Sequence, residues 1–249
     1  PDGSRVHPVL PPVAPDGPIL TIRKFSKEPL TMEQLVSWGS ITEEAVDFLR
    51  QLVEAGYNLF ISGGTGSGKT TFLGALSRFI PPMGRVITIE DSAELQLKTI
   101  PNLVRLEARN ANLEGENEVT IRDLIRASLR MRPDRILVGE VRGEEAFSML
   151  SAFNTGHDGS LCTGHGNSTA DMLARLETMV LMGANLPLEA IRSQIASALD
   201  VLVHLGRMRD KSRKVLEIAE IGGCEDGKVV LNPLFRFEEE GTGGGGKVE

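Results

Sequence analysis

The chain has 249 residues, a formal net charge of −7, 41% hydrophobic residues and 24% charged residues. This length allows one substantial core with a small appendage, and the acidic balance argues against a dedicated nucleic-acid-binding protein. No apolar run in the sequence reaches the length of a membrane span, and no secretory signal is recognised. The two cysteines, Cys162 and Cys224, lack metal-ligand spacing, which indicates a reduced, cytosolic setting.

The first 39 residues are expected to hold the end of one unit and a connection to the next. Five prolines lie between residues 8 and 18, residues 1–5 carry no sign of a helix or strand, and alternation at residues 20–23 predicts a strand. We expect residues 1–24 to be the C-terminal remnant of a small α/β domain, and residues 25–39 to form a linker and a first helix. Residues 40–240 then form the main domain, and the glycine-rich residues 241–249 are expected to be disordered.

Two capping-box patterns, at residues 31–34 and 40–43, each predict the start of a helix, and the second helix should stop at Gly56. The next predicted unit is a strand at residues 58–61, a glycine-rich loop and a helix that begins at Lys69. Its sequence fits G-x-x-x-x-G-K-[ST], the phosphate-binding P-loop. Glycines let backbone N–H groups wrap around phosphates, and the helix adds its positive dipole end. The predicted nucleotide ligands are Gly63, Gly64, Thr65, Gly66, Ser67, Gly68, Lys69, Thr70 and Thr71.

Two side chains of this loop have separate expected tasks. Lys69 should reach the β- and γ-phosphates of ATP, and the hydroxyl of Thr70 should hold Mg²⁺. We expect the Lys69 side chain to lie in an open, solvent-filled loop when no nucleotide is bound. The alternative is a flexible glycine-rich turn without a ligand, and the strand–loop–helix setting argues against it.

Apolar strands and helices alternate through the rest of the chain. Strands are predicted at residues 85–91, 103–106, 135–140 and 160–163, helices at residues 120–132, 144–152, 170–182 and 188–199, and further strands at residues 201–205, 215–221 and 229–231. This order predicts an α/β fold with a mainly parallel sheet covered on both faces. Ligands in such sheets bind at the carboxyl ends of the strands.

Carboxylates stand at the C-terminal ends of two of these strands, where Glu90 and Asp91 end one strand and Glu140 ends another. Hydrolysis of a γ-phosphate needs Mg²⁺ and a residue that orients the attacking water, and these carboxylates suit both tasks. Ordinary loop caps are the alternative interpretation. His165 follows a third strand and can read the γ-phosphate by hydrogen bonding, whereas a metal site at His157 and His165 is not expected because no ligand set completes it.

Six arginines are also expected to cluster around the strand exits. Most should be solvated charges, with one or two candidates for an arginine finger at the γ-phosphate. They are Arg105, Arg109, Arg130, Arg132, Arg135 and Arg142.

The residues around these carboxylates resemble the motifs of one ATPase superfamily. Residues 88–91 look like its Asp box, residues 129–142 are similar to its Walker B segment, and residues 155–157 with 163–165 resemble its His box. Together with the P-loop, these motifs resemble the type II/type IV secretion ATPases. Residues 154–160, and Arg5-Val6 followed by Pro11-Pro12, look most like the branch that drives tight-adherence (Flp-type) pili.

The resemblance implies a RecA-like motor domain preceded by a small α/β domain, a homo-hexameric ring, and hydrolysis of ATP with Mg²⁺. It places the protein in the cytoplasm, peripheral at the inner membrane, with a polytopic platform protein as partner and no direct contact with nucleic acid. By match, Glu90 activates water, Glu140 holds the Mg²⁺ shell and His165 senses the γ-phosphate. Arg5 and Arg23 match the part of the preceding domain that supplies cations across the nucleotide cleft.

One residue departs from the expected pattern, because Gly166 stands where the family resemblance leads us to expect alanine. Two rival functions stay open beside the pilus motor. The first is the ATPase of a conjugation-type or type IV secretion machine that moves protein or DNA. The second is an ATP-binding switch that signals through its conformation with little turnover.

Overall fold

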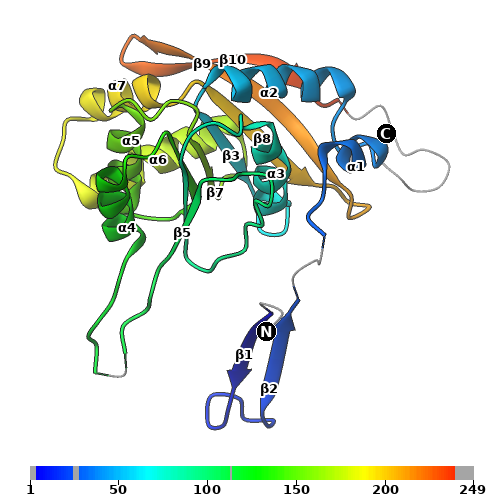
Figure 1. Cartoon of the computed structure of the whole chain (residues 1–249), viewed down its shortest axis with the longest axis vertical. Helices are drawn as coiled ribbons and strands as arrows, with labels where there is room; N and C mark the ends of the chain where they lie inside the picture. The colour runs from blue at the N-terminus through cyan, green and yellow to red at the C-terminus, as the bar shows by residue number, and fades with distance from the viewer. Residues whose placement is uncertain (1–3, 25–27, 113, 239–249) are drawn as a thin grey trace.

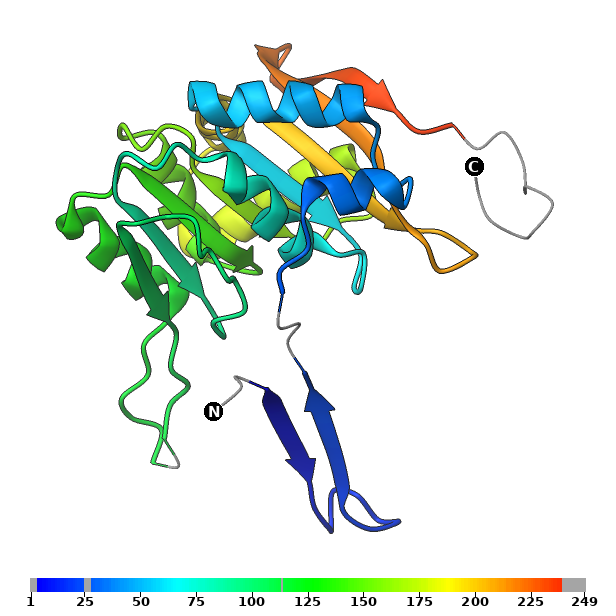
Figure 2. The same cartoon turned by 45° about the vertical axis from the view of Figure 1, so that its right-hand side comes forward.

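The structure, a computed structural model, describes residues 4–24, 28–112 and 114–238. The prediction of a disordered tail at residues 241–249 lies outside the described residues. Figures 1 and 2 show a central sheet with helices on both sides and a separate two-stranded hairpin near the N-terminus.

The central sheet has eight strands in the order β10-β9-β8-β3-β7-β6-β4-β5. From β8 to β5 all neighbouring strands are parallel, whereas β9 and β10 join in antiparallel fashion. The predicted mainly parallel α/β sheet is therefore confirmed. The strands are β3 (Leu59–Gly63), β4 (Val86–Glu90), β5 (Leu103–Glu107), β6 (Arg135–Val141), β7 (Leu161–Gly164), β8 (Val201–Arg207), β9 (Arg213–Glu225) and β10 (Lys228–Arg236).

Seven α-helices of the described chain cover the two faces of this sheet (Figure 1). They are α1 (Met32–Ser37), α2 (Glu43–Ala55), α3 (Lys69–Leu76), α4 (Ile121–Ser128), α5 (Glu145–Phe153), α6 (Thr169–Gly183) and α7 (Leu188–Ala198). Buried residues of α1 to α3 belong to one hydrophobic cluster, and those of α4 to α7 belong to the other. In β4, Val86 packs into the first cluster while Ile87 and Ile89 pack into the second, so both faces of the strand are buried.

Two short 3₁₀ turns, at Ser77–Phe79 and Leu129–Met131, end α3 and α4. Within the described ranges, no helix combines the length and the apolar character needed to cross a bilayer.

The helix boundaries confirm one capping pattern and correct the other. Thr31 forms a capping box with Gln34 at the start of α1, as predicted. The second helix does not begin at Ser40, because Thr42 is its cap and accepts a hydrogen bond from the backbone N–H of Ala45 at 3.3 Å. Its end at Gly56 is confirmed, with this glycine in the left-handed conformation at φ 88°.

The N-terminal residues form a hairpin that the sequence predicted only in half. Strand β1 (Arg5–Val9) pairs antiparallel with β2 (Ile19–Arg23), so the prediction that no strand starts at Arg5 was wrong. Pro8 obscured β1, yet proline is tolerated in an edge strand because its missing N–H can face solvent. That this hairpin is the remnant of a preceding domain stays a prediction.

Candidate nucleotide-binding site

The P-loop connects β3 to α3, and its backbone needs glycine at several positions. Gly66 and Gly68 have φ angles of 75° and 96°, in the left-handed region, and Gly68 caps the N-terminus of α3. A Cβ on Gly63 would lie 2.5 Å from the backbone oxygen of Leu205 on the neighbouring strand β8. The backbone at the end of β3 therefore packs closely against β8. The loop that follows presents its N–H groups beside the positive end of a helix, an arrangement that binds phosphate.

Lys69 is buried in this loop, so the expectation of an open, solvent-filled position was wrong. The residue is only 8% exposed, and its Nζ donates hydrogen bonds to the backbone oxygens of Gly63 at 3.0 Å and Gly64 at 3.2 Å. Burial lowers the pKa of Lys69, while the nearby Glu140 carboxylate opposes this shift. The ammonium group is thus already held inside the phosphate cradle, where phosphate oxygens can replace the two carbonyl oxygens.

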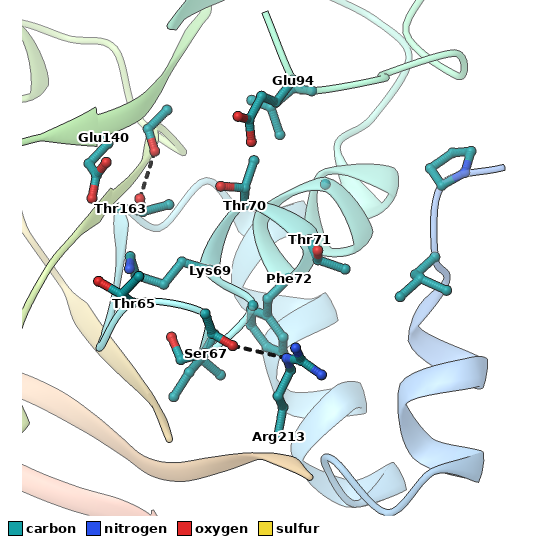
Figure 3. A pocket seen from close by; sticks show the side chains of 18 of the residues that line it. Thr65, Ser67, Lys69, Thr70, Thr71, Phe72, Glu94, Glu140, Thr163 and Arg213 are labelled. Atoms are coloured by element: carbon teal, nitrogen blue, oxygen red, sulfur yellow. Dashed lines mark hydrogen bonds between the residues drawn. The ribbon is translucent and has the colours of Figure 1, made fainter. Parts of the chain in front are cut away.

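A cavity of about 860 Å³ opens along the P-loop and is large enough for a nucleoside triphosphate. Figure 3 shows Thr65, Lys69, Thr70, Glu94 and Glu140 around one end of this cavity. Apolar side chains that suit a nucleobase form another part of the cavity wall. These apolar residues are Pro29, Leu30, Leu35, Trp38 and Val215.

Glu90 reaches the cavity from the carboxyl end of β4 and is 3% exposed. Its Oε1 accepts hydrogen bonds from the backbone N–H groups of Glu94 and Leu95, both at 2.9 Å, whereas Oε2 is buried without a hydrogen-bond partner among the described residues. Burial raises the pKa of Glu90. Space for this side chain comes from Gly139 on β6, where a Cβ would lie 3.0 Å from the Glu90 Cγ.

Glu140 lies near the carboxyl end of β6, and both oxygens of its carboxylate have polar neighbours. Its Oε2 accepts hydrogen bonds from Arg142 Nε at 2.8 Å and Nη2 at 2.5 Å, and its Oε1 contacts His165 Nδ1. The other ring nitrogen of His165 lies 3.1 Å from the hydroxyl of Thr65 in the P-loop. The exposed Asp91 also pairs with Arg142, and its Oδ2 lies 3.6 Å from the Arg142 Nη1. His165 therefore connects Glu140 directly to the phosphate cradle.

The donor set fits a magnesium ion that is bound together with a nucleotide. Thr70 supplies a hydroxyl, Glu140 a carboxylate, and the buried Glu90 Oε2 is an oxygen without a partner among the described residues. Among those residues, no group of three or more His, Cys, Asp and Glu side chains is placed to hold a metal alone. Magnesium commonly takes one or two protein oxygens, with phosphates and water completing its shell, so the arrangement suits it.

The cationic residues predicted from the sequence lie in different parts of the molecule. Arg23 lines the cavity and its Nη1 lies 3.2 Å from Glu94 Oε1, while the side chain of Arg5 is outside the described part of the structure. Of the six clustered arginines, only Arg142 lines the cavity. The expected cluster was wrong for Arg130, Arg132 and Arg135, because they lie before β6 or at its first residue, at the strand entry.

His157 also lies away from the cavity, before β7, where its Nδ1 is 2.8 Å from the backbone oxygen of Ala152. This contact gives His157 a structural role at the start of β7. The unexpected Gly166 has a packing reason, because a Cβ there would lie 3.1 Å from the Cβ of Met172.

Sequence reasoning missed four charged residues of the cavity wall, which are Lys24, Glu94, Arg213 and Lys214. Glu94 could have been noticed as a third carboxylate just after the Glu90-Asp91 strand exit. Arg213 is distant in sequence and offers no such signal. Its Nε donates to the backbone oxygen of Gly66 at 3.0 Å.

These features define a P-loop nucleotide-binding protein with a mainly parallel α/β sheet. The chain belongs to the type II/IV secretion system protein family, whose family model matches residues 1–234. A putative conjugal transfer protein of Mycobacterium tuberculosis is 43% identical over 221 residues, and this match covers 89% of the chain but only 62% of the relative. The type IV secretion system protein PtlH of Bordetella pertussis is 35% identical over 246 residues, covering 88% of the chain and 72% of the relative.

A solved structure supports the same assignment. The chain is similar to the VirB11 ATPase of the Brucella suis type IV secretion system, with a TM-score of 0.63 and 35% identity. That match covers 88% of the chain and 73% of the solved structure. The suspected superfamily and the RecA-like fold class are therefore confirmed.

Proposed function

We propose that the chain binds and hydrolyses Mg-ATP as the motor of a type II/type IV secretion-class machine. The observation that carries this proposal is one cavity in which a complete P-loop faces carboxylates from two neighbouring parallel strands, β4 and β6. Names of the relatives and of the solved VirB11 structure support it, and family membership provides the class of machine.

The proposed roles follow from the positions of the side chains. P-loop amides and Lys69 bind the phosphates, and Glu90, whose Oε2 has no partner among the described residues, accepts a proton from the attacking water. Thr70 and Glu140 would hold magnesium, which neutralises phosphate charge when bound. Glu140 must exchange a partner for this role, because His165 and Arg142 occupy its two oxygens. His165 would then report phosphate binding at Thr65 to Glu140.

Assembly and location are part of the same proposal. We infer a homo-hexameric ring that works in the cytoplasm at the inner membrane and docks on a polytopic platform protein. Its N-terminal arginines, Arg5 and Arg23, would supply cations across the nucleotide cleft. The motifs at residues 154–160 favour a tight-adherence pilus as the machine. The relatives named for conjugal transfer and type IV secretion favour the second candidate, a motor that moves protein or DNA.

Phosphate release from ATP tests the motor against the switch. The purified chain should release many equivalents of phosphate per protein in the presence of Mg²⁺, with a specific rate that rises with protein concentration as rings assemble. A single equivalent followed by arrest would contradict the motor and favour a switch. Stimulation by single-stranded DNA would favour a DNA-moving machine, whereas binding to a pilus platform protein would favour the pilus.

A further inference from the structure

We propose that Arg213 is a nucleotide ligand that contacts the ribose and α-phosphate side of the bound molecule. This inference rests on the proposed nucleotide-binding function and adds a residue that no motif identifies. Arg213 is the first residue of β9, far in sequence from the P-loop, yet it lines the same cavity.

The geometry brings the guanidinium group against the outer side of the phosphate cradle. Arg213 Nε donates to the backbone oxygen of Gly66 at 3.0 Å, and its Cδ lies 3.5 Å from the position that a Cβ on Gly68 would occupy. Figure 3 shows this side chain reaching from the β9 strand toward the loop. An arginine has five N–H donors, so this bond leaves the two Nη groups available to a ligand in the cavity.

The charges around Arg213 point to an anion. Arg207 on β8 lies directly opposite Arg213 in the register of the two strands, and like charges in this position are unfavourable. Residues 207–214 carry five Lys or Arg residues and one acidic residue, Asp210. Within the described residues, Arg213 forms no salt bridge with a carboxylate. A phosphate group would relieve the repulsion and satisfy the guanidinium together.

The location of Arg213 in the cavity indicates which part of the nucleotide it contacts. Lys69 and Glu140 mark the β/γ-phosphate end of the cavity, and Figure 3 shows Glu140 and Arg213 on opposite sides of the P-loop. Arg213 instead lies two residues before Val215, whose backbone N–H donates to the Ser40 oxygen at 2.8 Å. Ser40 follows α1, which carries Leu35 and is capped by Trp38, two of the apolar lining residues that suit the base. The part of a nucleotide between these two ends is the ribose with its α-phosphate.

Equilibrium titration with ADP and with a non-hydrolysable ATP analogue tests this assignment. Arg213→Ala should weaken both ligands by about tenfold or more, because a charge-assisted hydrogen bond is lost. The ratio of the two affinities should stay as in the wild type, since both ligands share the ribose and α-phosphate. Arg213→Lys keeps the charge but loses the planar guanidinium, so its affinities for both ligands should lie between those of the wild type and Arg213→Ala.

Arg207→Ala is the matched control, because it removes the same charge from the neighbouring strand β8. Arg207 pairs with Arg213 but does not line the cavity. It should change both affinities by less than about twofold. An equal loss in both alanine variants would reduce Arg213 to a distant electrostatic effect and overturn the assignment. A loss confined to the ATP analogue would place Arg213 at the γ-phosphate and also overturn it. Wild-type protein that binds neither nucleotide would instead refute the proposed function on which this inference rests.

Discussion

Replacing Glu90 by glutamine separates its proposed chemical role from its structural role. The carboxylate uses Oε1 to accept the N–H groups of Glu94 and Leu95, and its buried Oε2 has no hydrogen-bond partner among the described residues. Glutamine keeps an acceptor oxygen for both backbone groups but cannot take a proton from water. Glu90→Gln should therefore still bind Mg-ATP and hydrolyse it at least about 100-fold more slowly.

The stability of this variant has a definite sign. Burial raises the pKa of Glu90, so the folded state favours the protonated form, and ionisation of the carboxylate destabilises the fold as the pH rises through that pKa. Neutral glutamine avoids this effect, so Glu90→Gln should unfold at the same temperature as the wild type or higher at neutral pH. Glu90→Ala removes the acceptor of two backbone N–H groups and should lose about 1–3 kcal/mol of unfolding free energy.

Nucleotide binding, turnover and thermal unfolding should be measured on the wild type, Glu90→Gln and Glu90→Ala, because together they separate the chemical role of Glu90 from its structural role. The acidic limb of the wild-type turnover rate should lie at higher pH than for an ordinary glutamate, because Glu90 must be ionised to act as a base. Full activity in Glu90→Gln would refute this role. The roles would be reversed if Glu140→Gln then bound nucleotide normally and failed to hydrolyse it.

Three further substitutions probe other parts of the site. Glu140→Gln should raise the Mg²⁺ concentration needed for turnover, measured by magnesium titration of phosphate release; an unchanged midpoint would remove Glu140 from the metal site. Gly63→Ala should lower the unfolding free energy by about 2 kcal/mol or more in denaturant melts, since its Cβ would lie 2.5 Å from the Leu205 oxygen. Arg23→Ala should reduce turnover while nucleotide affinity falls little, because Arg23 meets the cavity from the hairpin; equal affinity and turnover losses would make it an ordinary ligand.

Local patterns predicted the parts of the fold that depend on neighbouring residues. The P-loop, the Thr31 cap and the apolar strands are all written within short segments, and the structure has them where they were expected. The capping pattern at residues 40–43 was ambiguous because Ser40 and Thr42 are both good caps, and tertiary packing selected Thr42. Strand β1 was missed because a proline-rich stretch gives no local sign of its pairing partner.

Contacts between distant segments set the limit of prediction for the site. Sequence reasoning placed Glu90, Glu140 and His165 at strand exits, and the parallel sheet brings all three to the cavity. It could not show that Lys69 bonds to its own loop, or that β9 delivers Arg213 to Gly66 across 147 residues. Arg130, Arg132 and Arg135 were misplaced although the chain direction already indicates their position, because they precede or begin the strand predicted at residues 135–140 and therefore lie at its entry.

ATP binding by the P-loop depends on the Lys69 ammonium group, and a titration of the wild type and one variant measures this dependence. ATP should bind the wild-type chain in the presence of Mg²⁺, and Lys69→Ala should weaken this binding by about tenfold or more and abolish phosphate release. Circular dichroism should show that the variant keeps its fold, so that the loss reports on the ammonium group. A folded Lys69→Ala protein that binds and hydrolyses ATP as well as the wild type would show that the P-loop is not the nucleotide-binding site.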